Sequence, residues 1–138
     1  MHARLNHVRV LRLLGGGLCV LTLGGCAFDV VSVKQVPAKF STAGVATESF
    51  ILVKEVKATF GTGFPTFLKA GTVWRCVGAI EAGAVYFTDD QIVKVEASNI
   101  YEARIVISDR RLVGFYLPVE KTFVPLPQPL ALEQKSQP

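Results

Sequence analysis

The chain has 138 residues, half of them hydrophobic, and carries 15 Lys and Arg against 11 Asp and Glu. Three of the positive residues and both histidines lie in the first 25 residues, whereas all 11 acidic residues come later. From residue 26 onwards the chain therefore has 12 positive and 11 negative side chains, a net charge of about +1, and no histidine. This balance argues against nucleic acid as a partner and removes the commonest general base and metal ligand.

The first 25 residues have the pattern of a secretory signal peptide. Arg4, Arg9 and Arg12 form a positive segment, and residues 13–23 form an uncharged apolar run of 11 residues. A run of this length is too short to span a bilayer, because a transmembrane helix needs about 20 apolar residues. The run ends at residues 23–26, which read Leu-Gly-Gly-Cys: a branched apolar residue, two small residues and a cysteine.

These four residues resemble the lipobox of bacterial lipoproteins at every position. The resemblance implies cleavage before Cys26 by signal peptidase II, a diacylglycerol on its sulfur, and acylation of its new amino group. Several acyl chains would anchor the chain firmly, since each buried CH2 contributes about 0.8 kcal/mol. The residue after the cysteine is Ala27. An aspartate there would resemble the inner-membrane retention signal of enterobacterial lipoproteins, so we expect an outer-membrane anchor with the domain facing the periplasm. The alternative is an ordinary signal peptide cut nearby by the general signal peptidase.

Cysteine usage limits how the exported part can be held together. Cys19 would leave with the signal peptide and Cys26 would be acylated, so Cys76 would be the remaining thiol and no intramolecular disulfide could form. The 113 residues from Cys26 onwards suffice for one small domain with an apolar core. We therefore expect a signal peptide (residues 1–25), a lipid-anchored β domain (26–124) and a proline-rich C-terminal tail (125–138).

Alternating and β-branched runs predict short strands throughout the exported part. We expect an irregular edge or loop over residues 35–47, and a hairpin formed by residues 100–108 and 112–117 with a charged tip at 109–111. The other strands are expected at residues 27–34, 48–60, 66–69, 72–80, 85–87 and 92–96. This pattern predicts an all-β fold, either a small antiparallel β-sandwich or a partly open β-barrel.

Several local motifs have a structural and a functional interpretation. Trp74, Cys76, Gly78 and Ile80 share one face of a predicted strand, which makes Cys76 a small buried hydrophobe rather than a nucleophile. Asp89 and Asp90 are expected to form a turn rather than a calcium site or catalytic pair. The glycines at 61 and 63 indicate a turn, not a phosphate loop. In the proline-rich tail, alternate prolines favour extended geometry, as a frayed end, an edge cover or a docking segment.

The leading functional hypothesis is a non-enzymatic envelope lipoprotein that binds another protein or a cell-wall component, including roles in a secretion apparatus or as an immunity or inhibitor lipoprotein. It rests on the lipobox and on the lack of hydrolase, metal or nucleotide motifs, and we expect no cofactor and no metal. Tyrosine and arginine are frequent anchors of binding surfaces. The candidate partner-binding residues are Arg75, Tyr86, Tyr101, Arg110, Arg111 and Tyr116.

Two alternatives belong to other classes. A carboxylate-based cell-wall hydrolase would use residues among Glu81, Asp89, Asp90 and Glu102, and would need one of them in a cleft with a raised pKa. A structural envelope spacer would have no discrete site. The sequence leaves both open, together with the oligomeric state.

Overall fold

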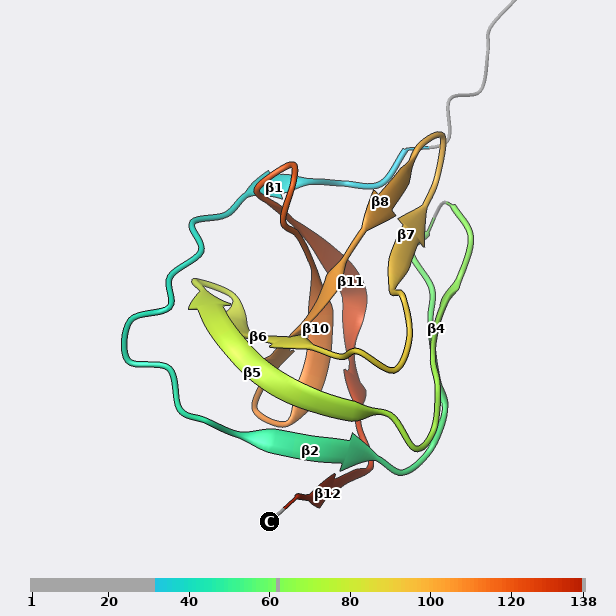
Figure 1. Cartoon of the computed structure of the whole chain (residues 1–138). Coiled ribbons are helices and arrows are strands. Elements are labelled where there is room, and N and C mark those ends of the chain that lie inside the picture. Colours follow the sequence, from blue (N-terminus) through green and yellow to red (C-terminus); the bar gives the residue numbers. More distant parts are fainter. Residues whose placement is uncertain (1–31, 62, 138) are drawn as a thin grey trace, which may run out of the picture. The chain divides into compact units, whose positions relative to one another are not determined.

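The computed structural model describes residues 32–61 and 63–137, and this part of the chain contains 12 β-strands and no helix (Figure 1). All strand pairs in it are antiparallel, so the predicted all-β fold is confirmed. Nothing in these two ranges forms a helix of the length and hydrophobicity that a membrane span requires. The predicted signal peptide and the lipobox at residues 23–26 lie outside the described residues.

One eight-stranded sheet forms most of the domain. It is strongly curved, with β2 and β5 on one side of the core and β10 and β11 on the other (Figure 1). The sheet is not closed into a barrel, although β11, next to one end of the sheet, and β12, at the other end, are separated by only two residues of the chain. In spatial order its strands are β1 (Val36–Pro37), β11 (Thr122–Ala131), β10 (Arg111–Leu117), β9 (Arg104–Ser108), β6 (Gly83–Phe87), β5 (Val73–Ile80), β2 (Ser49–Leu52) and β12 (Gln134–Ser136).

The proline-rich segment belongs to this sheet, which corrects the predicted boundary after residue 124. That boundary lies inside β11, which pairs with β10, while β12 pairs with β2. β11 pairs with β1 only at Thr122 and Phe123, so beyond these residues one edge of β11 has no paired strand among the described residues. Proline, which has no backbone N–H to donate, is tolerated on such a free edge. Pro125 lies opposite Gly114, next to a register shift in the ladder.

Two short hairpins, formed by β3 (Val56–Ala58) with β4 (Thr66–Leu68) and by β7 (Lys94–Glu96) with β8 (Ile100–Glu102), complete the described fold. The first of these hairpins contradicts the single strand predicted over residues 48–60, because β3 lies within that range but does not continue β2. The chain bends at exposed residues 53–55, and β2 and β3 enter different sheets. The predicted strand at 100–108 is likewise divided at Ala103, whose backbone N–H donates to the carbonyl of Val93. No strand forms at residues 32–34 of the predicted strand 27–34, and the rest of that range lies outside the described residues.

The main core lies between the curved sheet and the hairpins. Trp74 is fully buried in it, and its indole N–H donates to the Thr72 hydroxyl at 2.7 Å. Cys76 packs against the same core, as predicted, but it is half-buried rather than buried. The expected common face with Gly78 and Ile80 is wrong, because a bulge between Cys76 and Gly78 shifts the register of β5. Ile80 instead joins a second cluster, which includes Tyr116 and Val106.

Candidate functional site

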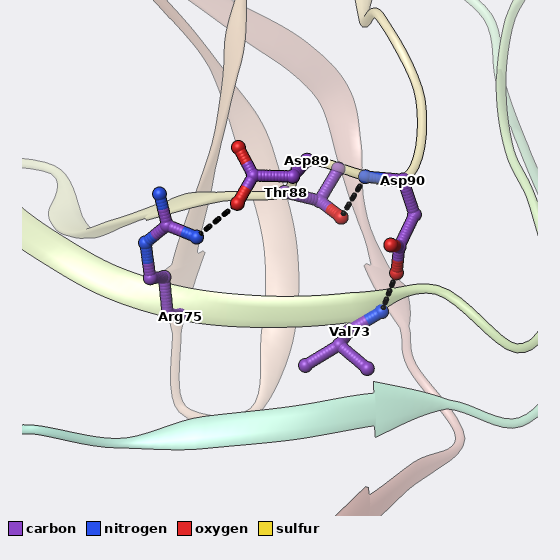
Figure 2. Close-up of polar contacts among 5 residues, drawn as sticks. All are labelled: Val73, Arg75, Thr88, Asp89 and Asp90. Carbon is purple, nitrogen blue, oxygen red and sulfur yellow. Dashed lines mark hydrogen bonds and ion pairs between the residues drawn. The ribbon is translucent and has the colours of Figure 1, made fainter.

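Arg75 and the two adjacent aspartates, Asp89 and Asp90, form polar contacts where the turn after β6 meets the first residues of β5 (Figure 2). The Arg75 guanidinium lies 2.6 Å from a carboxylate oxygen of Asp89, and both side chains are largely exposed. Asp90 accepts a hydrogen bond from the backbone N–H of Val73 at 2.7 Å, and its own N–H donates to the Thr88 hydroxyl at 3.1 Å. The aspartates therefore tie the turn after β6 to the start of β5, which is the turn-forming role predicted for them.

Arg75 also belongs to a stacked cluster around Phe87. The guanidinium carbons of Arg75 and Arg104 lie 4.8 and 5.4 Å from the centre of the Phe87 ring. Such cation–π contacts are worth about 0.5–1 kcal/mol at exposed sites. This stacking fixes Arg75 on β5, and the Asp89 carboxylate already occupies part of its hydrogen-bonding capacity. Arg75 therefore has a structural role whether or not it contacts a partner.

The four carboxylates of the hydrolase alternative do not form a buried pair. All four are exposed, and Glu81 lies beside Tyr116 and Lys121, away from the Asp89 network. Asp89 and Glu102 line one small cavity of about 160 Å³. A general acid needs a carboxyl group held away from water, and the exposed Asp89 is paired with a guanidinium. Within residues 32–61 and 63–137, no group of three or more potential metal-ligating side chains is gathered together.

A larger polar groove of about 540 Å³ lies where the β9–β10 turn approaches β2, β6 and β12. We call it the tip groove. Its volume is within the range of small-ligand sites, about 300–1,000 Å³. Its lining carries charges of both signs and several neutral hydrogen-bonding groups, chiefly from Glu48, Ser49, Tyr86, Asp109, Arg110 and Gln134.

The β9–β10 turn holds Arg110 beside this groove. Asp109 and Arg110 have φ angles of 51° and 63° and form a two-residue loop between Ser108 and Arg111, as in a type I′ turn. Glycine is preferred at such positions, because left-handed φ costs other residues about 1–2 kcal/mol. The side-chain amide of Gln134 donates to the Arg110 carbonyl at 3.2 Å and fastens the turn to β12. An arginine is therefore kept at a position where its backbone is strained.

Tyr86 and Glu48 form the inner wall of the tip groove. The buried Tyr86 donates its hydroxyl to the Glu48 carboxylate at 3.3 Å. Burial, reinforced by the neighbouring Cys76 and Glu48, raises the pKa of Tyr86 to about 12, so the phenol stays protonated and remains a donor. Burial likewise raises the pKa of the Cys76 thiol, which disfavours the reactive thiolate.

The structure brings together two of the six candidate partner-binding residues, Tyr86 and Arg110, in the tip groove. Arg111 is exposed at the start of β10, next to Arg110. Tyr101 is half-buried on β8, where its hydroxyl accepts a hydrogen bond from the Asn99 amide at 3.3 Å. Tyr116 is buried and stacks on Phe40, with ring centres 5.3 Å apart. The six residues therefore do not form one surface.

Sequence reasoning missed Glu48 and Gln134. Glu48 lies 38 residues from Tyr86 in the sequence, and Gln134 lies 24 residues from Arg110. Neither belongs to a motif, so their only signal is the strand pairing that the fold reveals. No protein-family model, curated protein or solved structure matches the chain.

Proposed function

We propose that this protein is a bacterial envelope lipoprotein without enzymatic activity, anchored in the outer membrane through an acylated Cys26. Its periplasmic β domain binds another component of the envelope, a protein or peptidoglycan. The observation that supports this most strongly is the Leu-Gly-Gly-Cys sequence of residues 23–26, preceded by a positive segment and an uncharged apolar run.

The tip groove supports a binding role for the domain. It combines the Glu48 carboxylate, the Arg110 guanidinium and neutral groups such as the Ser49 hydroxyl around one hollow. Peptides, including the stem peptides of peptidoglycan, present ammonium, carboxylate and amide groups that such a lining can match. The protonated Tyr86 fixes the Glu48 side chain, which lowers the cost of ordering it on binding.

Catalysis has less support from the same residues. The one thiol among the described residues, Cys76, has a raised pKa and packs against the core. The carboxylates of the hydrolase alternative are all exposed; Asp89 and Glu102 share one small cavity, where Asp89 is paired with Arg75, and Glu81 lies in a different pocket. A binding protein needs neither an activated nucleophile nor a carboxyl group held away from water.

Site-directed photocrosslinking in intact cells tests this proposal. A photoreactive amino acid replaces Ser136, which lines the tip groove, and a matched variant carries it at the exposed Lys57 on β3. The lipidated protein is then purified, and its adducts are identified by mass spectrometry. We expect one stoichiometric protein or a set of muropeptides from position 136 and none from position 57.

Equal yields from the two positions would contradict binding through the tip groove. No specific adduct from either position would contradict a binding role and favour the structural spacer. Soluble wall fragments that accumulate with the wild-type protein, and not with an Asp89→Asn, Glu102→Gln variant, would overturn the non-enzymatic assignment.

A further inference from the structure

The chain enters the β domain at one end of the curved sheet. Residues 32–35 lead into β1, and Val33 and Lys34 share a groove with Phe60 and Gly61 at the start of the β3–β4 connection. The backbone N–H of Ala38 donates to the carbonyl of Lys121 in the β10–β11 turn at 3.0 Å. The β7–β8 turn lies at the same end of the domain (Figure 1). We call this the entry end.

Exposed hydrophobic side chains concentrate at the entry end. Seven large hydrophobic residues are exposed in the described part of the chain, and four of them lie on these segments. Val36 of β1 is 41% exposed and Val119 of the β10–β11 turn is 79% exposed. Phe64 and Ile100, which are 63% and 66% exposed, lie on either side of Glu96: Phe64 donates its N–H to the Glu96 carbonyl, and Ile100 pairs with Glu96 across the β7–β8 hairpin.

The length of chain before the entry end identifies what would cover these side chains. Cys26 and Ser32 are six residues apart, and an extended stretch of that length reaches at most about 20 Å. If Cys26 is acylated, Ser32 must lie within that distance of the lipid surface. The four exposed apolar side chains lie at the end where the chain enters, so they are the part of the domain nearest to the bilayer.

We propose that the entry end is a membrane-docking surface, on which Val36, Phe64, Ile100 and Val119 contact the bilayer to which Cys26 is anchored. This inference rests on the acylation in the proposed function. Lys34 and Lys121, both exposed on the same segments, are suited to lipid phosphates, while the apolar side chains enter the headgroup region. Docking turns the β9–β10 turn away from the membrane, because that turn and the β10–β11 turn lie at opposite ends of β10. The tip groove then faces the periplasm.

Tryptophan quenching in vesicles tests the docking surface. The mature lipidated protein is reconstituted in phospholipid vesicles as a Val119→Trp variant and, for comparison, as a Lys135→Trp variant on β12. The native Trp74 is fully buried and gives the same background in both. Lipids brominated on the first part of their acyl chains should quench the new indole at position 119, shift its emission to the blue, and leave position 135 unaffected. An Ile100→Trp variant gives a second, independent reading.

Each outcome decides the proposal. Quenching at positions 119 and 100 but not at 135 supports docking, and equal quenching at all three positions, or none at any, overturns it. The intact mass of the same preparation reports the acyl groups separately. A full acyl mass without quenching would overturn the docking surface alone, whereas the lack of acyl groups on protein from the native host would overturn both the anchor and the docking.

Discussion

The Tyr86 hydroxyl donates to a carboxylate oxygen of Glu48 at 3.3 Å, and this bond joins β6 to the residue that precedes β2. The phenol ring is buried and packs on Phe50, with ring centres 5.3 Å apart, while the carboxylate lines the tip groove. The pair thus connects the core to the surface that we propose for binding. Its geometry leads to a prediction on the pH dependence of folding.

We predict that the wild-type protein loses stability relative to Tyr86→Phe as the pH rises from about 10 to 12. The folded-state pKa of Tyr86, about 12, exceeds its ordinary value of 10. The neutral phenol's contribution is therefore fully present below pH 10 and is lost as the pH rises through the folded-state pKa. Urea denaturation of both proteins at several pH values measures the difference, in which the titration of groups common to both largely cancels. A constant difference from pH 8 to 12 would contradict the raised pKa.

The adjacent aspartates should differ in their effect on stability, although both are exposed. Asp89 forms a surface ion pair with Arg75, and such pairs contribute about 0–1 kcal/mol. Asp90 instead accepts the backbone N–H of Val73 at the start of β5, and a hydrogen bond to a charged group contributes about 1.5–3 kcal/mol before exposure reduces it. Asp90→Ala should therefore lower the urea midpoint more than Asp89→Ala does. The opposite order would show that the ion pair with Arg75, and not the hydrogen bond from Val73, contributes more to the stability of the turn after β6.

Gly114 is predicted to be intolerant of a side chain. A Cβ at this position would approach the Val124 carbonyl and the Phe123 ring more closely than real Cβ atoms do. Because the carbonyl belongs to the paired strand β11, relief requires the ladder to shift, and overpacking of this kind costs about 1–3 kcal/mol. Gly61→Ala is the matched control, since nothing lies within 4 Å of its Cβ position. Thermal unfolding should give a lower midpoint for Gly114→Ala than for Gly61→Ala. Equal midpoints would mean that β11 can shift to accommodate the new Cβ at little cost in stability.

The strands that the sequence predicts well have long patterns of apolar and β-branched residues, whether alternating or continuous. Residues 72–80 and the 100–117 hairpin carry such patterns, and β5, β9 and β10 form there. The break after Leu52 was missed because Phe50, Leu52, Ala58 and Phe60 keep one parity and are all buried, and the exposed Lys54 at the corner is the single interruption of that pattern. The bulge after Cys76 was missed because it inserts one residue without any change in composition.

The tip groove could be predicted only in part. Arg110 was readable as part of a charged hairpin tip, and Tyr86 as an aromatic residue on a short strand. Their common groove depends on the pairing of β12 with β2 and of β6 with β9, which are long-range contacts that no local pattern encodes. The segment that brings Gln134 to the turn looked like a tail, because alternate prolines hide its strand character.

Cys26 is the predicted attachment site of the lipid anchor. Cys26→Ser removes the sulfur that would carry the diacylglycerol, so the variant should lose its acyl mass and either remain unprocessed or accumulate in soluble form. Fractionation of cells, with intact mass of the recovered protein, measures both effects. Cys76→Ser is the matched control: its thiol is half-buried and has a raised pKa, so its loss should leave membrane association unchanged. A mature Cys26→Ser protein that still fractionates with membranes would refute the lipobox interpretation.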